Sequence, residues 1–302
     1  MLRRGHHRQR EPVQVRVAGR GSVDVVTILV SGATGSVGGA VFTRLSEAGV
    51  DVRGGSRHPE SAGLPAGTAV RFDLGDPTTF RAALDGVDAV FLYATGHALE
   101  PFLQAARAAG SPRVVLLSSA SVVEPDADTS IIAVHHRGLE EAISAAGLPA
   151  TFLRAGDFAT NTLRWAPGIR TGGSVALPYT EARLAPIHEL DIADVAVQAL
   201  TGDGLIGRAS LLRGPDVRTQ RDQVSALSRA LGRSLQVEEL TPDEARQQMG
   251  AFVPAPVVDT LLAFLASRVD TTVELTDEVE AITGHPARSF DVWARDHVDA
   301  FR

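Results

Sequence analysis

The segment from Asp24 to Gly49, DVVTILVSGATGSVGGAVFTRLSEAG, joins a β-branched apolar run to a helical pattern through a glycine-rich turn. Its apolar residues Val37, Val41 and Leu45 recur at helical spacing, and Gly49 ends the pattern. Glycines between a strand and a helix allow a sharp turn and a close approach to a pyrophosphate, whose charge is attracted by the free N–H groups of the helix start. The segment therefore predicts the first strand, loop and helix of a dinucleotide-binding α/β fold. A tight turn without a ligand is the alternative.

Strands and helices alternate through the first half of the chain. Further strands are predicted at 50–57, 68–74, 88–95, 113–121 and 150–156, and helices at 77–86, 101–110 and 140–147. The strands are apolar throughout, which indicates a parallel sheet covered on both faces. After Asp157 the rhythm gives way to loops with glycine and proline, a clear helix at 191–200 and a helix-rich tail. We therefore expect a Rossmann-like, doubly wound α/β core at 24–157, its interleaved completion with a smaller C-terminal substrate lobe at 158–302, and a flexible extension at 1–23.

The composition restricts the chemistry. A chain of 302 residues with 44% hydrophobic residues can bury a large core. Its formal charge of −7 disfavours nucleic acid and anionic membranes as partners, and no run of about 18 apolar residues predicts a membrane span. The absence of cysteine excludes thiolate chemistry, and the absence of lysine excludes lysine-based mechanisms. We expect a cytoplasmic protein, monomeric or homodimeric, that acts on a small molecule.

The residues that would hold the dinucleotide follow from the loop and from the ends of the next two strands. Ser56 and Arg57 end the second strand, where an NAD-specific site places an acidic residue, and arginine suits the 2′-phosphate of NADP(H). A solvated surface arginine is the alternative. Asp73 and Leu74 are predicted beside the adenine, and Asp76 is predicted to cap the following helix. The loop residues predicted to bind the pyrophosphate are Gly32, Ala33, Thr34, Gly35, Ser36, Val37 and Gly38.

The motifs together carry a family likeness. GATGSVG, DLGD, LLSSAS, a helix with Glu140 and GLPATFLRAGDFATN resemble the NmrA-like and isoflavone-reductase-like branch of the atypical short-chain dehydrogenases, over about Thr27 to Arg302. Reductases of the broader superfamily use a Tyr-x-x-x-Lys pair on the helix after the fifth strand. The matching positions in this chain are Ile132 and His136. The resemblance therefore implies NAD(P)H binding without the usual proton donor.

His136 is the most informative residue of this helix. The resemblance places it toward the nicotinamide ribose, with Glu140 one turn further along the same face. His136 is predicted as a general acid or a ribose-binding residue, because imidazole titrates near neutrality. A structural histidine paired with Glu140 is the alternative. No metal site is predicted, because these two ligands, without cysteine or a third partner, fall short of a zinc site.

Residues at the remaining strand ends are predicted to line the site, because ligands bind at the carboxyl edge of a parallel sheet. Ser119 and Asn161 would face the substrate, although Asn161 alternatively stabilises its own loop. The predicted cofactor-facing set is Ala94, Thr95, Ser118, Ala155, Gly156 and Phe158, the last three through the resemblance. Residues that would shape a substrate pocket in the lobe, or else its core, are Trp165, Tyr179, His188, Phe252, Leu261 and Phe264.

These observations predict an NADPH-dependent reductase of a small quinone, enone or aromatic, polyketide-like carbonyl compound. His136, Ser119 and Asn161 are its predicted catalytic residues. A quinone needs little acid assistance and so tolerates the lost tyrosine. Two readings from other classes stay open: a non-redox enzyme that cyclises or couples a polyketide-type metabolite, and a dinucleotide-sensing regulatory protein.

Overall fold

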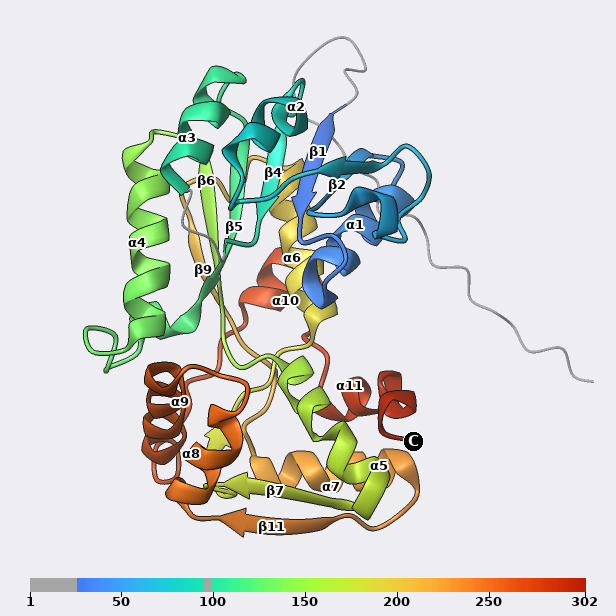
Figure 1. The fold of residues 1–302 in the computed structure, drawn as a ribbon, viewed down its shortest axis with the longest axis vertical. Helices are drawn as coiled ribbons and strands as arrows, with labels where there is room; N and C mark the ends of the chain where they lie inside the picture. The colour runs from blue at the N-terminus through green and yellow to red at the C-terminus, as the bar shows by residue number, and fades with distance from the viewer. Residues whose placement is uncertain (1–25, 95–98) are drawn as a thin grey trace, which may run out of the picture.

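The computed structural model describes residues 26–94 and 99–302, so the predicted extension at 1–23 and the Thr95 prediction lie outside the described residues. A seven-stranded sheet in the order β3-β2-β1-β4-β5-β6-β9 forms its centre, and all its neighbouring strands are parallel. The prediction of a doubly wound parallel sheet is therefore confirmed (Figure 1). The strands are β1 Thr27–Ser31, β2 Asp51–Ser56, β3 Ala69–Arg71, β4 Ala89–Leu92, β5 Arg113–Ser119, β6 Ala150–Ala155 and β9 Ala209–Leu212.

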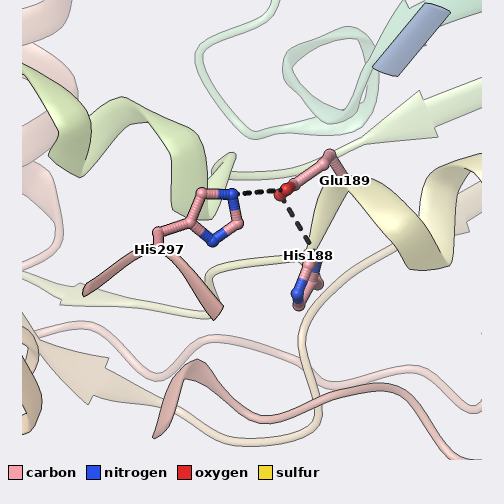
Figure 2. A group of neighbouring side chains, drawn as sticks. All are labelled: His188, Glu189 and His297. Carbon is pink, nitrogen blue, oxygen red and sulfur yellow. Dashed lines mark ion pairs between the residues drawn. The ribbon is translucent and has the colours of Figure 1, made fainter. Parts of the chain in front are cut away.

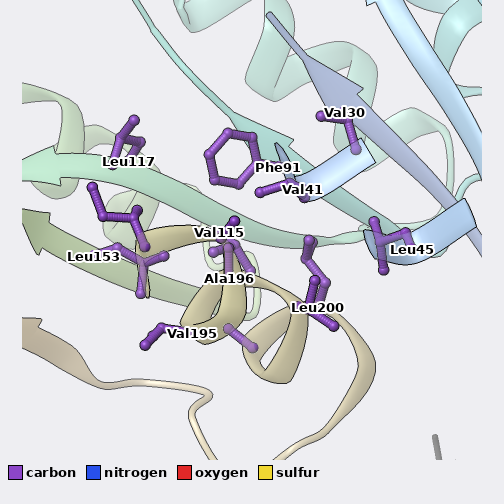
Figure 3. Packing of buried hydrophobic residues seen from close by; sticks show 14 of the residues in the cluster. Val30, Val41, Leu45, Phe91, Val115, Leu117, Leu153, Val195, Ala196 and Leu200 are labelled. Carbon is purple, nitrogen blue, oxygen red and sulfur yellow. The ribbon is translucent and has the colours of Figure 1, made fainter. Parts of the chain in front are cut away.

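Helices cover both faces of this sheet. Helices α1 (Ser36–Glu47) and α6 (Glu189–Thr201) pack on one face, and α2 (Phe80–Leu84), α3 (Leu99–Ala108) and α4 (Ile131–Ala145) pack on the other. Within β1, Ile28 and Val30 point into the first layer while Leu29 points into the second, because successive strand side chains alternate between faces. Figure 3 shows the first layer, where Phe91, Val115 and Leu153 of three strands meet side chains of α1 and α6. Burial on both faces explains why the strands are apolar throughout.

The chain leaves the sheet twice after β6 and builds a second group of elements, seen in the lower half of Figure 1. Trp293, Phe290 and Ile169 are fully buried in one core of this group, and Leu262 belongs to another. Strand β11 pairs in parallel with β7, and β10 pairs antiparallel with β8. The elements of this group are α5 Ala166–Gly172, β7 Ser174–Pro178, β8 Arg183–Leu184, β10 Arg218–Thr219, α7 Gln220–Leu231, β11 Gln236–Leu240, α8 Pro242–Gly250, α9 Ala255–Ser267 and α11 Phe290–Asp296. Helix α10 (Glu278–Thr283) instead packs against α6 beside the central sheet.

Helix α4 begins nine residues before the predicted helix at 140–147, at Ile131. The side chain of Ser130 accepts a hydrogen bond from the Ala133 N–H and so caps the first turn, and this capping signal was missed in the sequence. The earlier start places Ile132 and His136 on the same helix as Glu140. None of the helices in the described ranges is long and apolar enough to cross a membrane. Short 3₁₀ helices lie at η1 Pro59–Ser61, η2 Pro77–Thr79, η3 Ala120–Val123, η4 Ala159–Trp165 and η5 Val298–Phe301.

Candidate functional site

The glycine-rich loop forms a cradle at the start of α1. Gly32 has φ +63°, and its carbonyl accepts a hydrogen bond from the Gly35 N–H at 2.9 Å. A Cβ on Gly38 would lie 2.3 Å from the Gly32 carbonyl oxygen, so the tight turn requires glycine there. No side chain caps the helix at Gly35, which leaves the first N–H groups of α1 available to an anion. Thr34, Gly35 and Ser36 are exposed, so the loop fits the pyrophosphate of a dinucleotide.

A cavity of about 270 Å³ lies at the carboxyl ends of β4, β5 and β6. Its position next to the switch point between β1 and β4 is where open α/β sheets bind ligands. Tyr93 lies where β4 ends, and the Ser31 hydroxyl at the end of β1 accepts a 2.7 Å hydrogen bond from its N–H. The predicted residues that line this cavity are Ser118, Ser119, Ile132, His136, Ala155, Gly156, Phe158, Asn161, Leu261 and Phe264.

The residues predicted for the adenosine half lie elsewhere on the sheet edge. Ser56 ends β2, and Arg57 is exposed just beyond it. Asp73 stays beside its own loop, where a carboxylate oxygen accepts the Gly75 N–H at 2.9 Å. Asp76 caps η2 by accepting the Thr78 N–H, as predicted. Ser56, Arg57 and Asp73 do not line the cavity, as expected of groups that would hold the far end of a dinucleotide.

Glu140 belongs to a buried network that excludes the predicted pairing with His136. Arg154 donates to both Glu140 oxygens, at 3.0 and 2.5 Å, and the Ser118 hydroxyl donates to one of them at 2.6 Å. Ser118 and Arg154 are register partners on β5 and β6, so both reach the same side of α4. No hydrogen bond joins Glu140 to His136 within the described ranges. The alternative of a structural His136–Glu140 pair is therefore wrong, because Arg154 is the stronger partner for a carboxylate.

His136 lines the cavity as an uncharged imidazole. Burial and the neighbouring His135 lower its pKa to about 4, against the weaker opposing effect of Glu140. Its Nδ1 atom is buried and has no hydrogen-bond partner among the described residues. A neutral imidazole carries one N–H donor and one acceptor nitrogen. Because Nδ1 is buried, the ring nitrogen that a ligand would meet is Nε2, and a neutral His136 with its hydrogen on Nε2 can donate to a ligand at neutral pH without being an imidazolium.

Five charged residues of the cavity lining, Glu124, Asp126, Asp157, Arg213 and Arg268, were missed in the sequence, and three of them form one ion-pair cluster. Glu124 follows η3, Arg213 follows β9, and Arg268 ends α9. Glu124 accepts from Arg213 at 2.6 Å and also pairs with Arg268. Arg213 could have been found from its position directly after the strand-like ASLL stretch, because that places it at the carboxyl edge. Arg268 had no such signal, because the approach of α9 to the sheet is a long-range contact.

Four of the six lobe residues proposed for a pocket do not line this cavity, and these are Trp165, Tyr179, His188 and Phe252. Trp165 packs against a hydrophobic core, Tyr179 packs against another, and Phe252 is 91% exposed. These predictions are wrong for the cavity because apolar spacing does not show which way an element faces. His188 lies in a different cluster.

His188 and Glu189 at the start of α6 meet His297 near the end of the chain (Figure 2). Glu189 contacts His297 Nε2 at 2.8 Å and His188 Nδ1 at 3.2 Å, and it also accepts the Trp293 indole N–H at 3.0 Å. Burial lowers the pKa of His297, but hydrogen bonds to Glu189 and to the Trp293 carbonyl outweigh it, so the pKa is raised. The three ligand-type atoms lie within 4.8 Å of one another. The Glu189 carboxylate already contacts donor groups of the protein. The cluster therefore fits an ion-pair network that holds the C-terminal segment against α6.

Comparison with known proteins agrees with this geometry. Residues 32–203 match the family model described as NAD(P)H-binding. The chain belongs to this NAD(P)H-binding family. It is 44% identical, over 91% of its length and 99% of the relative, to the (4-alkanoyl-5-oxo-2,5-dihydrofuran-3-yl)methyl phosphate reductase of Streptomyces griseus. It is 33% identical to the NAD(P)H azoreductase of Xenophilus azovorans, over 91% and 99% of the two chains.

Solved structures show the same fold. The NADPH-dependent quinone oxidoreductase of Escherichia coli superposes with a TM-score of 0.74 at 22% identity, over 91% of this chain and all of that one. With the family match and the reductase relatives, the protein is an NAD(P)H-dependent reductase.

Proposed function

We propose that the protein reduces a conjugated carbonyl compound, such as an acylated butenolide, another enone or a quinone, with NADPH. The observation that carries this proposal is the position of the neutral His136, with an unpartnered ring nitrogen, in the cavity at the carboxyl edge of the sheet. The substrate in the name of the Streptomyces griseus relative contains an unsaturated lactone with an acyl group, which is a conjugated carbonyl compound. NADPH supplies a hydride when bound.

The chain's own residues have distinct tasks in this scheme. The uncapped N-terminus of α1 and the close turn at Gly38 hold the pyrophosphate. Arg57 pairs with the 2′-phosphate. Addition of hydride to the far end of an enone leaves negative charge on the carbonyl oxygen, and His136 donates its N–H to that oxygen. A preorganised donor stabilises such an oxyanion more in a water-poor cavity than in water. The enolate carbon then takes a proton from solvent, which completes the reduction.

The proposal is tested by following NADPH absorbance after adding 2-acylbutenolides, simple enones and quinones to the full-length protein. Oxidation with a saturated product from the butenolide would support it. Tight NADPH binding without turnover on any of these compounds would favour a sensor, and failure to bind either nucleotide would favour a non-redox enzyme.

Arg57→Ala tests the cofactor preference. We expect NADPH affinity to fall about tenfold to 100-fold, because a charge-assisted hydrogen bond contributes about 1.5 to 3 kcal/mol. NADH affinity should change less than about twofold, since NADH lacks the 2′-phosphate. Calorimetric titration of both nucleotides measures this difference, with Arg107→Ala on α3 as the control for loss of an exposed arginine. If the affinities for NADH and NADPH fell equally, the role of Arg57 would be structural instead.

His136→Phe tests the proton-handling role. We expect kcat/KM for an enone to fall about 100-fold, the usual cost of losing one oxyanion donor. His136→Gln should recover part of this loss because it keeps an N–H donor. His135→Phe, a change at the adjacent exposed residue, should leave the rate unchanged. A loss of NADPH affinity at constant kcat would instead make His136 a ribose-binding residue.

The pH profile separates a neutral donor from an imidazolium acid. Because the pKa of His136 is lowered to about 4, the imidazole stays neutral from pH 8 down to about pH 5. The rate should therefore be flat over this range and change only as the pH approaches 4, where the imidazole becomes charged. A general acid that had to be protonated would instead become less active as the pH rises. Initial rates across this range, with NMR titration of His136, measure the result.

A further inference from the structure

We propose that Arg213 and Arg268 form an anion-binding subsite of the cavity, which takes a phosphate monoester or carboxylate group of the substrate. This inference rests on the proposed function, in that the anion belongs to the compound being reduced. The subsite would make the reductase prefer substrates that carry a negative charge.

The first support is the convergence of two guanidinium groups on one cavity from separate elements. Arg213 comes from the end of β9 and Arg268 from the end of α9, and both line the cavity together with His136. Both are more than nine-tenths buried, at 8% and 7% exposure. Arginine is rarely buried to this extent without a full set of partners. A pair of arginines beside a ligand cavity therefore needs a reason beyond surface solvation.

The second support is the number of donors that stay unused. Each guanidinium donates one hydrogen bond, through one terminal nitrogen, to a single Glu124 oxygen. The Nε–H groups of Arg213 and Arg268 are buried and have no acceptor among the described residues. An unmet buried donor costs about 1 to 3 kcal/mol. The second terminal nitrogen of each guanidinium also makes no hydrogen bond among the described residues, and an oxyanion in the cavity would meet these terminal N–H groups rather than the buried Nε–H groups.

The charges at the subsite permit a further anion. Glu124 offsets one of the two arginines, Asp157 is a second carboxyl group close to both, and the exposed Asp126 is a third carboxyl group of the cavity lining. Burial raises the pKa of Asp157 against the opposing effect of the arginines, which weakens its competition for them. Arg268 also lies over the Phe264 ring, at 4.9 Å from its centroid, which holds the guanidinium at the cavity wall. Two arginines held in place are well suited to bind a carboxylate or phosphate through forked hydrogen bonds.

The subsite also explains how an amphiphilic substrate would be oriented. The cavity lining that includes the arginines and His136 also contains apolar residues such as Leu117, Phe158 and Leu261. A compact ring with an anionic substituent would place its ring against this wall and its charge on the arginines. Its carbonyl group would then be left for His136 at the sheet edge.

The test is calorimetric titration of the full-length, NADPH-loaded protein with phenyl phosphate, benzoate and the neutral benzyl alcohol. We expect phenyl phosphate or benzoate to bind at least about tenfold more tightly than benzyl alcohol, because one charge-assisted hydrogen bond contributes at least this difference in affinity. Preference between the two anions distinguishes a phosphate from a carboxylate subsite. Equal affinity for all three probes would overturn the proposal.

Two variants separate an anion site from a structural ion cluster. Arg213→Gln should remove the preference for the anions, and Glu124→Gln should strengthen anion binding several-fold because it removes a competing carboxylate while keeping the side chain's shape. A structural cluster predicts the opposite for Glu124→Gln, namely a lower melting temperature with no gain in anion affinity. Arg208→Gln is the matched control, because Arg208 lies at the other end of β9 and pairs with Glu278. These titrations need no turnover, so failure of the reductase assay leaves their result intact, and absence of anion binding leaves reduction of a neutral enone intact.

Discussion

Gly38→Ala is expected to abolish measurable NADPH binding. The added Cβ would lie 2.3 Å from the Gly32 carbonyl oxygen and 2.7 Å from its carbonyl carbon, so the loop must move away from α1. The movement would misplace the first N–H groups of the helix, and loss of about two charge-assisted hydrogen bonds corresponds to at least about a 100-fold loss of affinity. Calorimetric titration with NADPH measures the effect.

Gly138→Ala is the matched control for this experiment. Gly138 lies in the interior of α4, and a Cβ there would meet nothing within 4 Å. The same chemical change should therefore stabilise the protein by about 0.5 to 1 kcal/mol, because alanine is the better helix former. NADPH affinity should stay unchanged. If Gly38→Ala kept wild-type affinity and a wild-type melting temperature, the proposed cofactor cradle would be in the wrong place.

Arg154→Met is expected to destabilise the protein by about 3 to 5 kcal/mol, because it leaves the buried Glu140 carboxylate without its charged partner. Glu140 is 5% exposed and keeps the Ser118 hydroxyl as a donor in the variant, which is too weak a partner for a buried charge. Urea unfolding at neutral pH measures the change. Reduction should fall along with stability, since Ser118 and the end of β6 border the cavity.

A second substitution tests the cause. Adding Glu140→Gln to Arg154→Met removes the stranded charge, and about 2 kcal/mol of stability should return. The control is Arg137→Met on the same helix. Arg137 pairs with the exposed Asp128, and loss of such a pair should cost no more than about 1 kcal/mol. If Arg154→Met and Arg137→Met lowered the free energy of unfolding equally, the burial of Glu140 would not be the cause of the destabilisation.

Local sequence patterns were enough to predict those parts of the site that are formed by consecutive residues at the end of a strand. The first strand, the glycine loop and α1 occupy consecutive residues, and their signal is a change from β-branched residues to glycines and then to helical spacing. The carboxyl ends of β5 and β6 followed from the same reasoning, because parallel strands end at one edge of the sheet. Helix α4 was predicted too short because its Ser130 cap was not recognised.

The pairing of Glu140 shows where such reasoning stops. Spacing along one helix favoured His136 as its partner, since the two residues are one turn apart. The register of β5 against β6 decides otherwise, because it brings Arg154 beside Ser118 and directs both to Glu140. The free energy of a buried carboxylate depends on which cation the fold delivers to it, and strand register is not visible within one helix.

The sequence by itself determined the α/β class, the glycine cradle and the carboxyl edge as the place of binding, because each depends on residues close together in the chain. The tertiary structure decided which side chains meet at that edge. Glu124, Arg213 and Arg268 converge from three distant segments, and His136 is neutral because the surrounding fold buries it. Burial and charge are properties of packed neighbours, and these neighbours are chosen by long-range contacts.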